Sequence, residues 1–280
     1  MYKPSVREQM AYTFQLNRMA MRIFLVIFLF NIIVCSYSQK QGVIYKAEFA
    51  DEGDGASVQR LFPSSNFDHL DPFVLLDDFN VQPPAGFPDH LHKGFEAITY
   101  MIEGGFQHQD NLGNNRIVYA GGAQRFTAGS GLIHSEMPGT KGVNRGLQLW
   151  LNIPIEQKSS SPSYQQVDSS QFPVEIINGV TVKHIVGNGS PLKVQTDLIY
   201  QDIQLNGNTF TINTSPSRNS FIYVLNGDIL INGTIALKAN SFYIIPAGSL
   251  ELTGNINARI VYLSAIPLNQ KIKQRGPFVY

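Results

Sequence analysis

The chain has 280 residues, with 21 basic and 21 acidic residues, and therefore no formal net charge at pH 7. This balance excludes an extended basic surface of the kind that binds nucleic acids, and a hydrophobic content of 43% excludes a largely disordered chain. Valine, isoleucine, threonine and aromatic residues recur in short runs separated by glycine and asparagine, so we predict an all-β protein.

The N-terminal residues have the pattern of a targeting segment. Arg18 and Arg22 lead into an apolar run, Ile23–Val34, that is shorter than the roughly 20 residues needed to cross a bilayer. Small residues at Ser36–Ser38 follow it, as at the cleavage site of a secretory signal. We therefore predict a signal peptide over residues 1–38 and a secreted or periplasmic protein without a stable membrane span after cleavage. A short membrane anchor is the alternative interpretation.

The only cysteine, Cys35, lies inside this segment, so the mature chain has no thiol. A lipoprotein signal would need a small residue before the cysteine, and Val34 does not fit. The mature protein is thus expected to have no disulfide bond, no thiolate metal site and no cysteine nucleophile. Any metal ion must be held by nitrogen and oxygen ligands.

Short strands separated by turns are predicted from Gly42 onward. The clearest strand patterns in the first half are Gly42–Phe49, Asp71–Phe79, Gly94–Ile102, Gln124–Pro138 and Arg145–Pro154. Between the third and the fourth, His108–Gly122 has a Gly113-Asn114 turn between polar flanks, which predicts a β-hairpin. Residues 156–173 are rich in serine, glutamine and proline, which is typical of a linker, and strand patterns resume after them.

The two halves of the chain share a pattern. Ile98–Gly105 (ITYMIEGG) resembles Phe221–Asp228 (FIYVLNGD), and further along each half Phe126–Gly131 resembles Ile244–Ser249. A repeat of strands and glycine turns in the same order predicts two copies of one antiparallel β-barrel. Because the histidines concentrate in the first copy, we expect any site to lie there and the second copy to be its degenerate twin.

Two pairs of alternating residues in the first copy are candidate metal ligands. His90 and His92 are two residues apart, as are His134 and Glu136, and this spacing places both members of a pair on one face of a strand. Neighbouring antiparallel strands are about 5 Å apart, so two such pairs can surround one cation with three imidazoles and a carboxylate. This donor set suits Fe, Mn, Ni, Cu or Zn, and a six-coordinate ion would keep two positions for substrate or oxygen. A surface pair on a loop is the alternative for the first two histidines alone.

Other polar residues have plainer interpretations. Glu96 could be a fifth ligand, but a hydrogen bond to a neighbouring ligand or to the barrel backbone is the preferred interpretation. His108 is interpreted as a residue of the hairpin flank that pairs with Asp110. His69 and His184 have no evident partners and are expected to be surface residues or to have satisfied hydrogen bonds, and Trp150 is expected to lie in the core.

Long motifs in a fixed order make the sequence resemble the pirin family of bicupins. They are LDPFVLLDDF, PAGFPDHLHKGFEAITYMIEGG, TAGSGLIHSEMP, LQLWLNIP and a terminal GPFV, and the resemblance is close over Leu70–Pro154 and looser elsewhere. The metal ligands of the family fall on His90, His92, His134 and Glu136, the set that the spacing also indicates. The resemblance implies iron in the N-terminal cupin and no metal site in the C-terminal one.

The sequence patterns and the resemblance together predict the organisation of the chain. We expect a signal peptide (1–38), an N-terminal cupin with the metal site (39–155), a linker (156–173) and a C-terminal cupin without a metal site (174–280). The fold expected is all-β, with two tandem antiparallel jelly-roll barrels.

Some pirins resemble quercetin 2,3-dioxygenases, which open a flavonol ring with O₂. The resemblance therefore implies a small planar phenolic substrate, O₂, and one divalent transition metal, with Fe expected and Mn, Ni, Cu and Zn as alternatives. Glu136 would accept the phenolic proton as a general base. One alternative is a non-catalytic fold stabilised by metal. The other is a redox-responsive regulatory module, and the export signal and the lack of a basic stripe argue against this second alternative. No nucleic-acid partner is expected.

Overall fold

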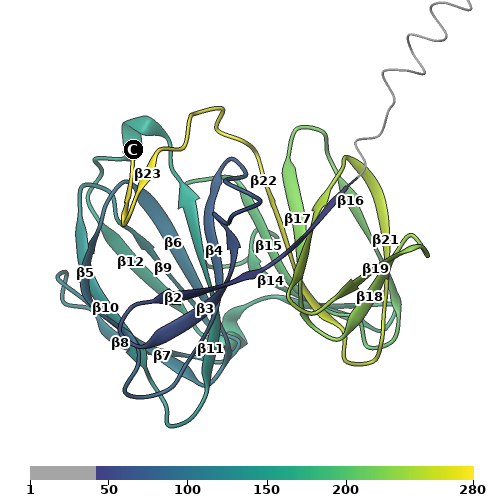
Figure 1. The fold of residues 1–280 in the computed structure, drawn as a ribbon, viewed down its shortest axis with the longest axis horizontal. Helices are drawn as coiled ribbons and strands as arrows, with labels where there is room; N and C mark the ends of the chain where they lie inside the picture. The colour runs from purple at the N-terminus through teal and green to yellow at the C-terminus, as the bar shows by residue number, and fades with distance from the viewer. Residues whose placement is uncertain (1–41) are drawn as a thin grey trace, which may run out of the picture. The chain divides into compact units, whose positions relative to one another are not determined.

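The structure, a computed structural model, describes residues 42–280. The predicted signal peptide lies outside these residues. Within them the chain is mostly β-strand, with two short 3-10 helices, η1 (Ile155–Gln157) and η2 (Ser169–Gln171). None of the helices in this part of the chain has the length and apolar character needed to span a membrane. The strands build two similar domains of antiparallel sheets (Figure 1), which confirms the predicted fold class.

The first domain combines a seven-stranded sheet with a four-stranded sheet. In spatial order the larger sheet consists of β12 (Ser163–Val167), β9 (Ala123–Thr127), β6 (Phe95–Glu103), β11 (Asn144–Asn152), β4 (Phe73–Val81), β3 (Ala56–Phe62) and β2 (Glu48–Glu52). The smaller sheet consists of β5 (Phe87–His92), β10 (Leu132–Pro138), β7 (Gly105–Asp110) and β8 (Asn115–Tyr119). Phe79, Met101, Phe106 and Val118 pack together as part of its buried core. The predicted hairpin is confirmed by the antiparallel pairing of β7 with β8.

The second domain repeats this arrangement. Its larger sheet consists of β1 (Val43–Lys46), β20 (Ser241–Ile245), β17 (Asn219–Asn226), β22 (Arg259–Ala265), β15 (Leu198–Gln204), β14 (Val180–Val186) and β13 (Val174–Ile177). Its smaller sheet consists of β16 (Thr209–Thr214), β21 (Gly248–Gly254), β18 (Asp228–Ile231) and β19 (Ile235–Lys238). The order β20-β17-β22-β15-β14 repeats the order β9-β6-β11-β4-β3, so the internal repeat inferred from the sequence is a structural repeat.

Terminal and connecting segments cross between the domains in a way that differs from the expected organisation. β1 precedes the first domain in sequence but pairs with β20 in the second. β12 lies within the predicted linker, yet it pairs with β9 and extends the first domain's larger sheet. A composition rich in serine and glutamine does not exclude an edge strand: Tyr164 packs against the core and its hydroxyl donates to Gln124 Oε1 at 2.9 Å.

The C-terminal residues also return to the first domain. β23 (Gln274–Arg275) and β24 (Phe278–Val279) form a small hairpin, coloured yellow in Figure 1. Phe278 forms a parallel bridge with Lys93, and the Val279 amide donates to the Lys93 carbonyl at 3.0 Å. The end of the terminal GPFV motif therefore lies directly beside the strand that carries His90 and His92.

Buried polar groups tie the two larger sheets together in matched pairs. Tyr100 of the first domain donates to Asp202 of the second at 2.6 Å, and Arg259 also binds this carboxylate. At the equivalent place, Tyr223 donates to Asp78 at 2.9 Å, and Arg145 also binds Asp78. Each buried carboxylate is thus fully paired, as a charge inside a protein requires.

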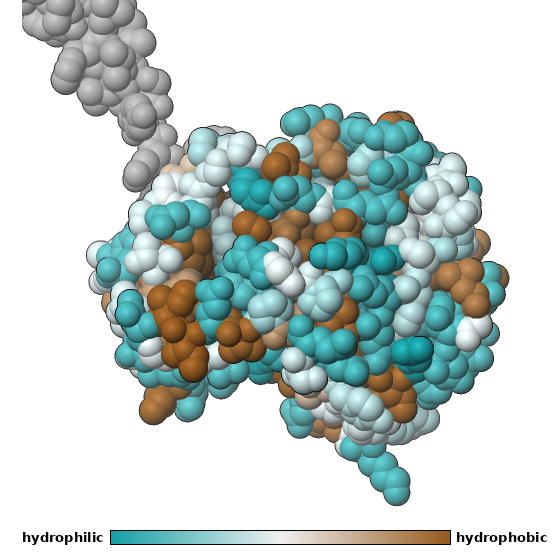
Figure 2. All heavy atoms as spheres, turned by 180° about the vertical axis from the view of Figure 1, so that it is seen from behind, coloured by the Kyte–Doolittle hydropathy of each residue, from teal (hydrophilic) through white to brown (hydrophobic). Residues whose placement is uncertain are grey.

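Hydrophobic residues on the surface are scattered. On the face shown in Figure 2 they form separate groups among hydrophilic residues. Large apolar side chains that are exposed include Phe49, Ile155, Ile176 and Ile256. They come from different elements of the two domains, and single exposed apolar residues of this kind are normal in globular proteins.

Candidate metal centre

The four predicted ligands lie on two adjacent strands of the smaller sheet. β5 pairs with β10, and this register places His134 directly opposite His90. A β-bulge follows between His134 and Glu136, so that Glu136 pairs with Phe87. Bulges re-aim side chains at the rims of barrels and beside active sites. His92, His134 and Glu136 are buried and His90 is partly buried.

The structure brings the three histidines together by their Nε2 atoms. His90 Nε2 lies 2.8 Å from His92 Nε2 and 3.1 Å from His134 Nε2. Two nitrogen ligands at right angles on one ion lie about 3.0 Å apart when each metal–nitrogen bond is roughly 2.1 Å. The three imidazoles therefore have the spacing expected of nitrogen donors that share one ion.

The other ring nitrogens determine which tautomer each histidine adopts. His90 Nδ1 lies 2.7 Å from the Pro88 carbonyl, and His92 Nδ1 lies 3.2 Å from the Pro277 carbonyl. A carbonyl oxygen only accepts, so in the neutral rings both Nδ1 atoms carry the proton and both Nε2 atoms present lone pairs. Two lone pairs that face each other at 2.8 Å repel unless a cation lies between them. These residues therefore fit a divalent metal ion.

Burial keeps the His92 and His134 rings neutral, as metal ligation requires. Desolvation lowers the pKa of His92 to about 3, with a further contribution from neighbouring His90. Desolvation and the surrounding histidines also hold the pKa of His134 well below its usual value. An imidazole with a lowered pKa presents its lone pair at neutral pH.

Glu136 is surrounded by hydrogen-bond donors from three strands of the larger sheet. Its Oε1 accepts from Thr99 Oγ1 at 3.0 Å and from Gln124 Nε2 at 2.7 Å, and its Oε2 accepts from Gln148 Nε2 at 3.0 Å. Burial nevertheless raises the pKa of Glu136 to about 7. The carboxylate comes within 4.8 Å of ring nitrogens of His134 and His108 but does not join the group of His90, His92 and His134. The four-ligand set remains a prediction.

The raised pKa of Glu136 has a consequence for the metal-free protein. Between pH 4.5 and about 7 the folded state holds a proton that the unfolded chain releases, so the stability contribution of Glu136 falls as the pH rises through this window. We expect the melting temperature of Glu136→Gln, measured with a chelator present, to increase relative to that of the parent as the pH rises. A constant difference between the two melting temperatures across this pH window would show that the pKa of Glu136 is not raised. The pKa of buried Asp77 is also raised, but Asp77 is present in both proteins, so its contribution to the pH dependence cancels in the comparison.

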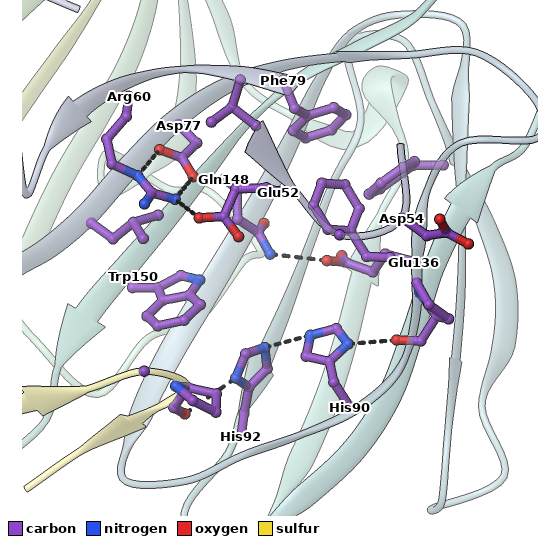
Figure 3. A pocket seen from close by; sticks show the side chains of 18 of the residues that line it. Glu52, Asp54, Arg60, Asp77, Phe79, His90, His92, Glu136, Gln148 and Trp150 are labelled. Atoms are coloured by element: carbon purple, nitrogen blue, oxygen red, sulfur yellow. Dashed lines mark hydrogen bonds and ion pairs between the residues drawn. The ribbon is translucent and has the colours of Figure 1, made fainter. Parts of the chain in front are cut away.

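A cavity of about 510 Å³ opens beside these residues. Ligand pockets usually measure roughly 300–1,000 Å³. Figure 3 shows His90 and His92 on one side of the cavity, with Trp150 close to His92 and Glu136 on a neighbouring wall. The Trp150 ring stacks on Phe95 with centroids 4.2 Å apart and meets the His92 ring edge at 4.9 Å. Trp150, expected to be core, is thus also part of the cavity wall.

The opposite side of the cavity is acidic. Arg60 donates to both oxygens of Asp77, at 2.9 and 2.7 Å, and to Glu52 at 2.6 Å (Figure 3). The guanidinium therefore pairs with two carboxylates. Asp54 and Asp89 also line the cavity, and Arg60 is the only lysine or arginine among the described lining residues. The cavity thus carries an excess of negative charge.

The remaining candidates have structural contacts. Glu96 is buried and accepts from the Thr127 hydroxyl at 2.7 Å and from the Gln195 amide at 2.8 Å, and neither partner is a predicted ligand. His69 contacts the Val74 carbonyl at 2.9 Å. Buried His184 accepts from Asn188 and Gln201.

His108 has a larger role than the sequence suggested. It is fully buried, its Nε2 lies 3.0 Å from Asp110 Oδ2, and its Nδ1 lies 3.4 Å from His134 Nδ1. The pairing with Asp110 was expected, but the contact with a predicted ligand was not. The signal was present in the sequence, because His108 and Asp110 have the same two-residue spacing as the two ligand pairs.

The second domain has no equivalent cluster among the described residues. β16 and β21 occupy the places of β5 and β10, and neither strand contains a histidine. The two groups of potential ligands found in residues 42–280 both lie in the first domain.

Comparisons with known proteins agree with this architecture. The pirin domain family matches residues 55–151, and the pirin C-terminal cupin domain matches residues 200–280. The chain is 41% identical to Pirin-like protein 2 of Arabidopsis thaliana over 251 residues, which cover 83% of this chain and 77% of that protein.

The fold of this chain is similar to that of quercetin 2,3-dioxygenase from Acinetobacter baumannii, with 26% identity, a TM-score of 0.77, and coverage of 85% and 90% of the two chains. The fold also matches that of the Escherichia coli pirin YhhW, solved with nickel(II), with 22% identity, a TM-score of 0.68, and coverage of 81% and 100%. Sequence, fold and domain order together place the chain in the pirin family of bicupins.

Proposed function

We propose that this bicupin is an iron-dependent dioxygenase of quercetin-like flavonols or related phenolics, with the metal held by His90, His92, His134 and Glu136. The observation that carries the proposal is the convergence of three histidine Nε2 atoms beside a ligand-sized cavity. A bound iron would act as a Lewis acid toward a phenolic oxygen. Mn, Ni, Cu and Zn are alternatives that suit the same donors.

Aromatic walls support a planar substrate. Phe79 and Phe106 stack with centroids 4.6 Å apart, Phe87 meets the Phe106 ring edge-on, and all three line the cavity. Trp150 lines it on the histidine side. Aromatic rings recognise planar ligands through offset stacking and edge contacts.

Glu136 is suited to accept the phenolic proton. A general base must lie within reach of the proton that it accepts, and Glu136 lines the same cavity as His90 and His92. Gln124 and Gln148 hold the carboxylate in place by donating to its two oxygens.

Oxygen uptake tests this proposal. The protein is loaded with ferrous iron without air, quercetin is added under air, and the oxygen concentration is followed. The proposal expects uptake that requires both quercetin and bound iron. Full iron occupancy without uptake would instead identify a metal-stabilised binding module, especially if the melting temperature rises with iron.

The acidic cavity predicts selectivity against anionic phenols. We expect catechol to inhibit quercetin-dependent uptake at a concentration about 10-fold lower than its carboxylated analogue protocatechuate, since a tenfold ratio needs only about 1.4 kcal/mol of repulsion. Asp54→Asn combined with Asp89→Asn should narrow this difference, because both carboxylates line the cavity. Equal inhibition by the two compounds in the parent would contradict the prediction.

We also propose that the protein is exported, on the basis of its basic and apolar N-terminal sequence. Cell fractionation would test this: the proposal expects a periplasmic or extracellular protein that starts at Gln39.

A further inference from the structure

We propose that His108 and Asp110 are positioning residues that fix the tautomer of His134 and direct its Nε2 lone pair toward the metal. This inference rests on the proposed role of His134 as a ligand. It concerns two buried residues that are not in the predicted ligand set, and it explains why a carboxylate and an imidazole lie behind that ligand.

The three side chains form a directional chain of contacts. Asp110 Oδ2 lies 3.0 Å from His108 Nε2, and because an ionised carboxylate only accepts, His108 Nε2 carries the proton. In the neutral ring His108 Nδ1 is then an acceptor. It faces His134 Nδ1 at 3.4 Å, so His134 Nδ1 donates and its Nε2 keeps a lone pair. That Nε2 is the atom that lies 3.1 Å from His90 Nε2.

The strand register and aromatic packing support this chain. β7 pairs with β10 so that Asp110 lies opposite His134 and His108 lies opposite Glu136. The Tyr164 ring stacks on the His108 ring with centroids 4.4 Å apart, which prevents the imidazole from rotating. His108 thus faces the Nδ1 edge of His134, away from the Nε2 edge that contacts His90.

The turn between β7 and β8 fixes the position of the Asp110 carboxylate. Its Oδ1 accepts the backbone amides of Leu112 and Asn114, both at 3.0 Å, and its Oδ2 receives Asn114 Nδ2 at 2.8 Å as well as His108. The hairpin therefore holds the carboxylate at one end of the chain of contacts, and a metal would stabilise the other end. Groups of this kind behind a ligand typically change metal affinity by about 10–100-fold when they are lost.

Asp110→Asn is the decisive variant because it reverses the donor and acceptor roles along Asp110, His108 and His134 with a side chain of nearly the same shape. The two backbone amides require an acceptor at the Oδ1 position, so the new amide NH₂ faces His108 Nε2, and the Asn114 side-chain amide flips to present its oxygen to this NH₂. His108 then carries its proton on Nδ1, His134 Nδ1 becomes the acceptor, and a proton occupies His134 Nε2. The variant should bind metal about 10-fold to 100-fold more weakly.

Two variants at His108 separate positioning from direct ligation. A glutamine can donate to Asp110 and accept from His134, so His108→Gln should keep affinity within about threefold of the parent if it restores the relay. His108→Phe keeps the stacking on Tyr164 but loses both hydrogen bonds, and should bind about as weakly as Asp110→Asn. Gln109→Ala, on the exposed face of the same strand, is the matched control and should bind like the parent.

Cobalt(II) binding to the full chain provides the test. The affinity is read from quenching of Trp150, the only tryptophan, and the coordination from the visible absorption spectrum of the bound cobalt. We expect weaker binding in Asp110→Asn and His108→Phe, and a parent-like spectrum and affinity in His108→Gln, with circular dichroism confirming that each variant is folded.

Three results would overturn the inference. Parent-like affinity in Asp110→Asn means that the relay does not act on His134. A changed cobalt spectrum with weak binding in His108→Gln makes His108 itself a ligand. If the parent protein binds no cobalt, both the proposed metal site and the positioning role are contradicted. Because turnover is not measured, absence of dioxygenase activity with normal binding would count against the proposed function alone.

Discussion

His92→Ala is expected to reduce bound iron to less than a tenth of the parent content. His92 presents its Nε2 2.8 Å from that of His90, and the Pro277 carbonyl holds its other nitrogen, so the substitution removes one of the three converging nitrogen donors. Loss of an outer partner alone costs about 10–100-fold in affinity, and loss of a ligand should cost more. Elemental analysis after iron loading and gel filtration measures the effect.

His69→Ala is the matched control for this variant. It removes a histidine of the same domain whose Nδ1 contacts the Val74 carbonyl and which lies outside the histidine cluster. The control should keep the parent iron content. Equal iron in His92→Ala and the parent would remove His92 from the ligand set.

Glu136→Gln should lower quercetin-dependent oxygen uptake per bound iron by about 10²–10⁴-fold. The substitution keeps the shape of a side chain that is buried among Thr99, Gln124 and Gln148, but it removes the base that accepts the phenolic proton. Division of the rate by bound iron separates lost proton transfer from weaker metal binding, which is also expected if Glu136 is a ligand.

Glu52→Gln is the control, because it neutralises a cavity carboxylate that contacts Arg60 at the opposite side. Its rate per bound iron should stay close to that of the parent. If Glu136→Gln also turns over like the parent at full iron occupancy, the general base lies elsewhere.

The histidine cluster could be predicted because alternation along a strand is a local property. Two-residue spacing placed His90 with His92 on one face, and pairing of β5 with β10 then brought His134 opposite His90. The bulge before Glu136 could not be predicted, because it depends on how the backbone of β10 meets β5.

The features that were missed depend on sheet order and long-range contacts. The role of His108 follows from the place of β10 between β5 and β7, which the sequence does not show. The contact of Pro277 with His92 joins residues 185 positions apart. The serines and glutamines of β12 resemble loop composition and predict a linker, although Tyr164 and Val167 pack inward.

Anomalous diffraction at the iron edge from crystals of the iron-loaded protein tests the metal centre most directly. The expected result is one anomalous peak in the first domain, within bonding distance of Nε2 of His90, His92 and His134 and of a Glu136 oxygen. A peak elsewhere, or the three Nε2 atoms still in mutual contact with no peak between them, would contradict the proposed site.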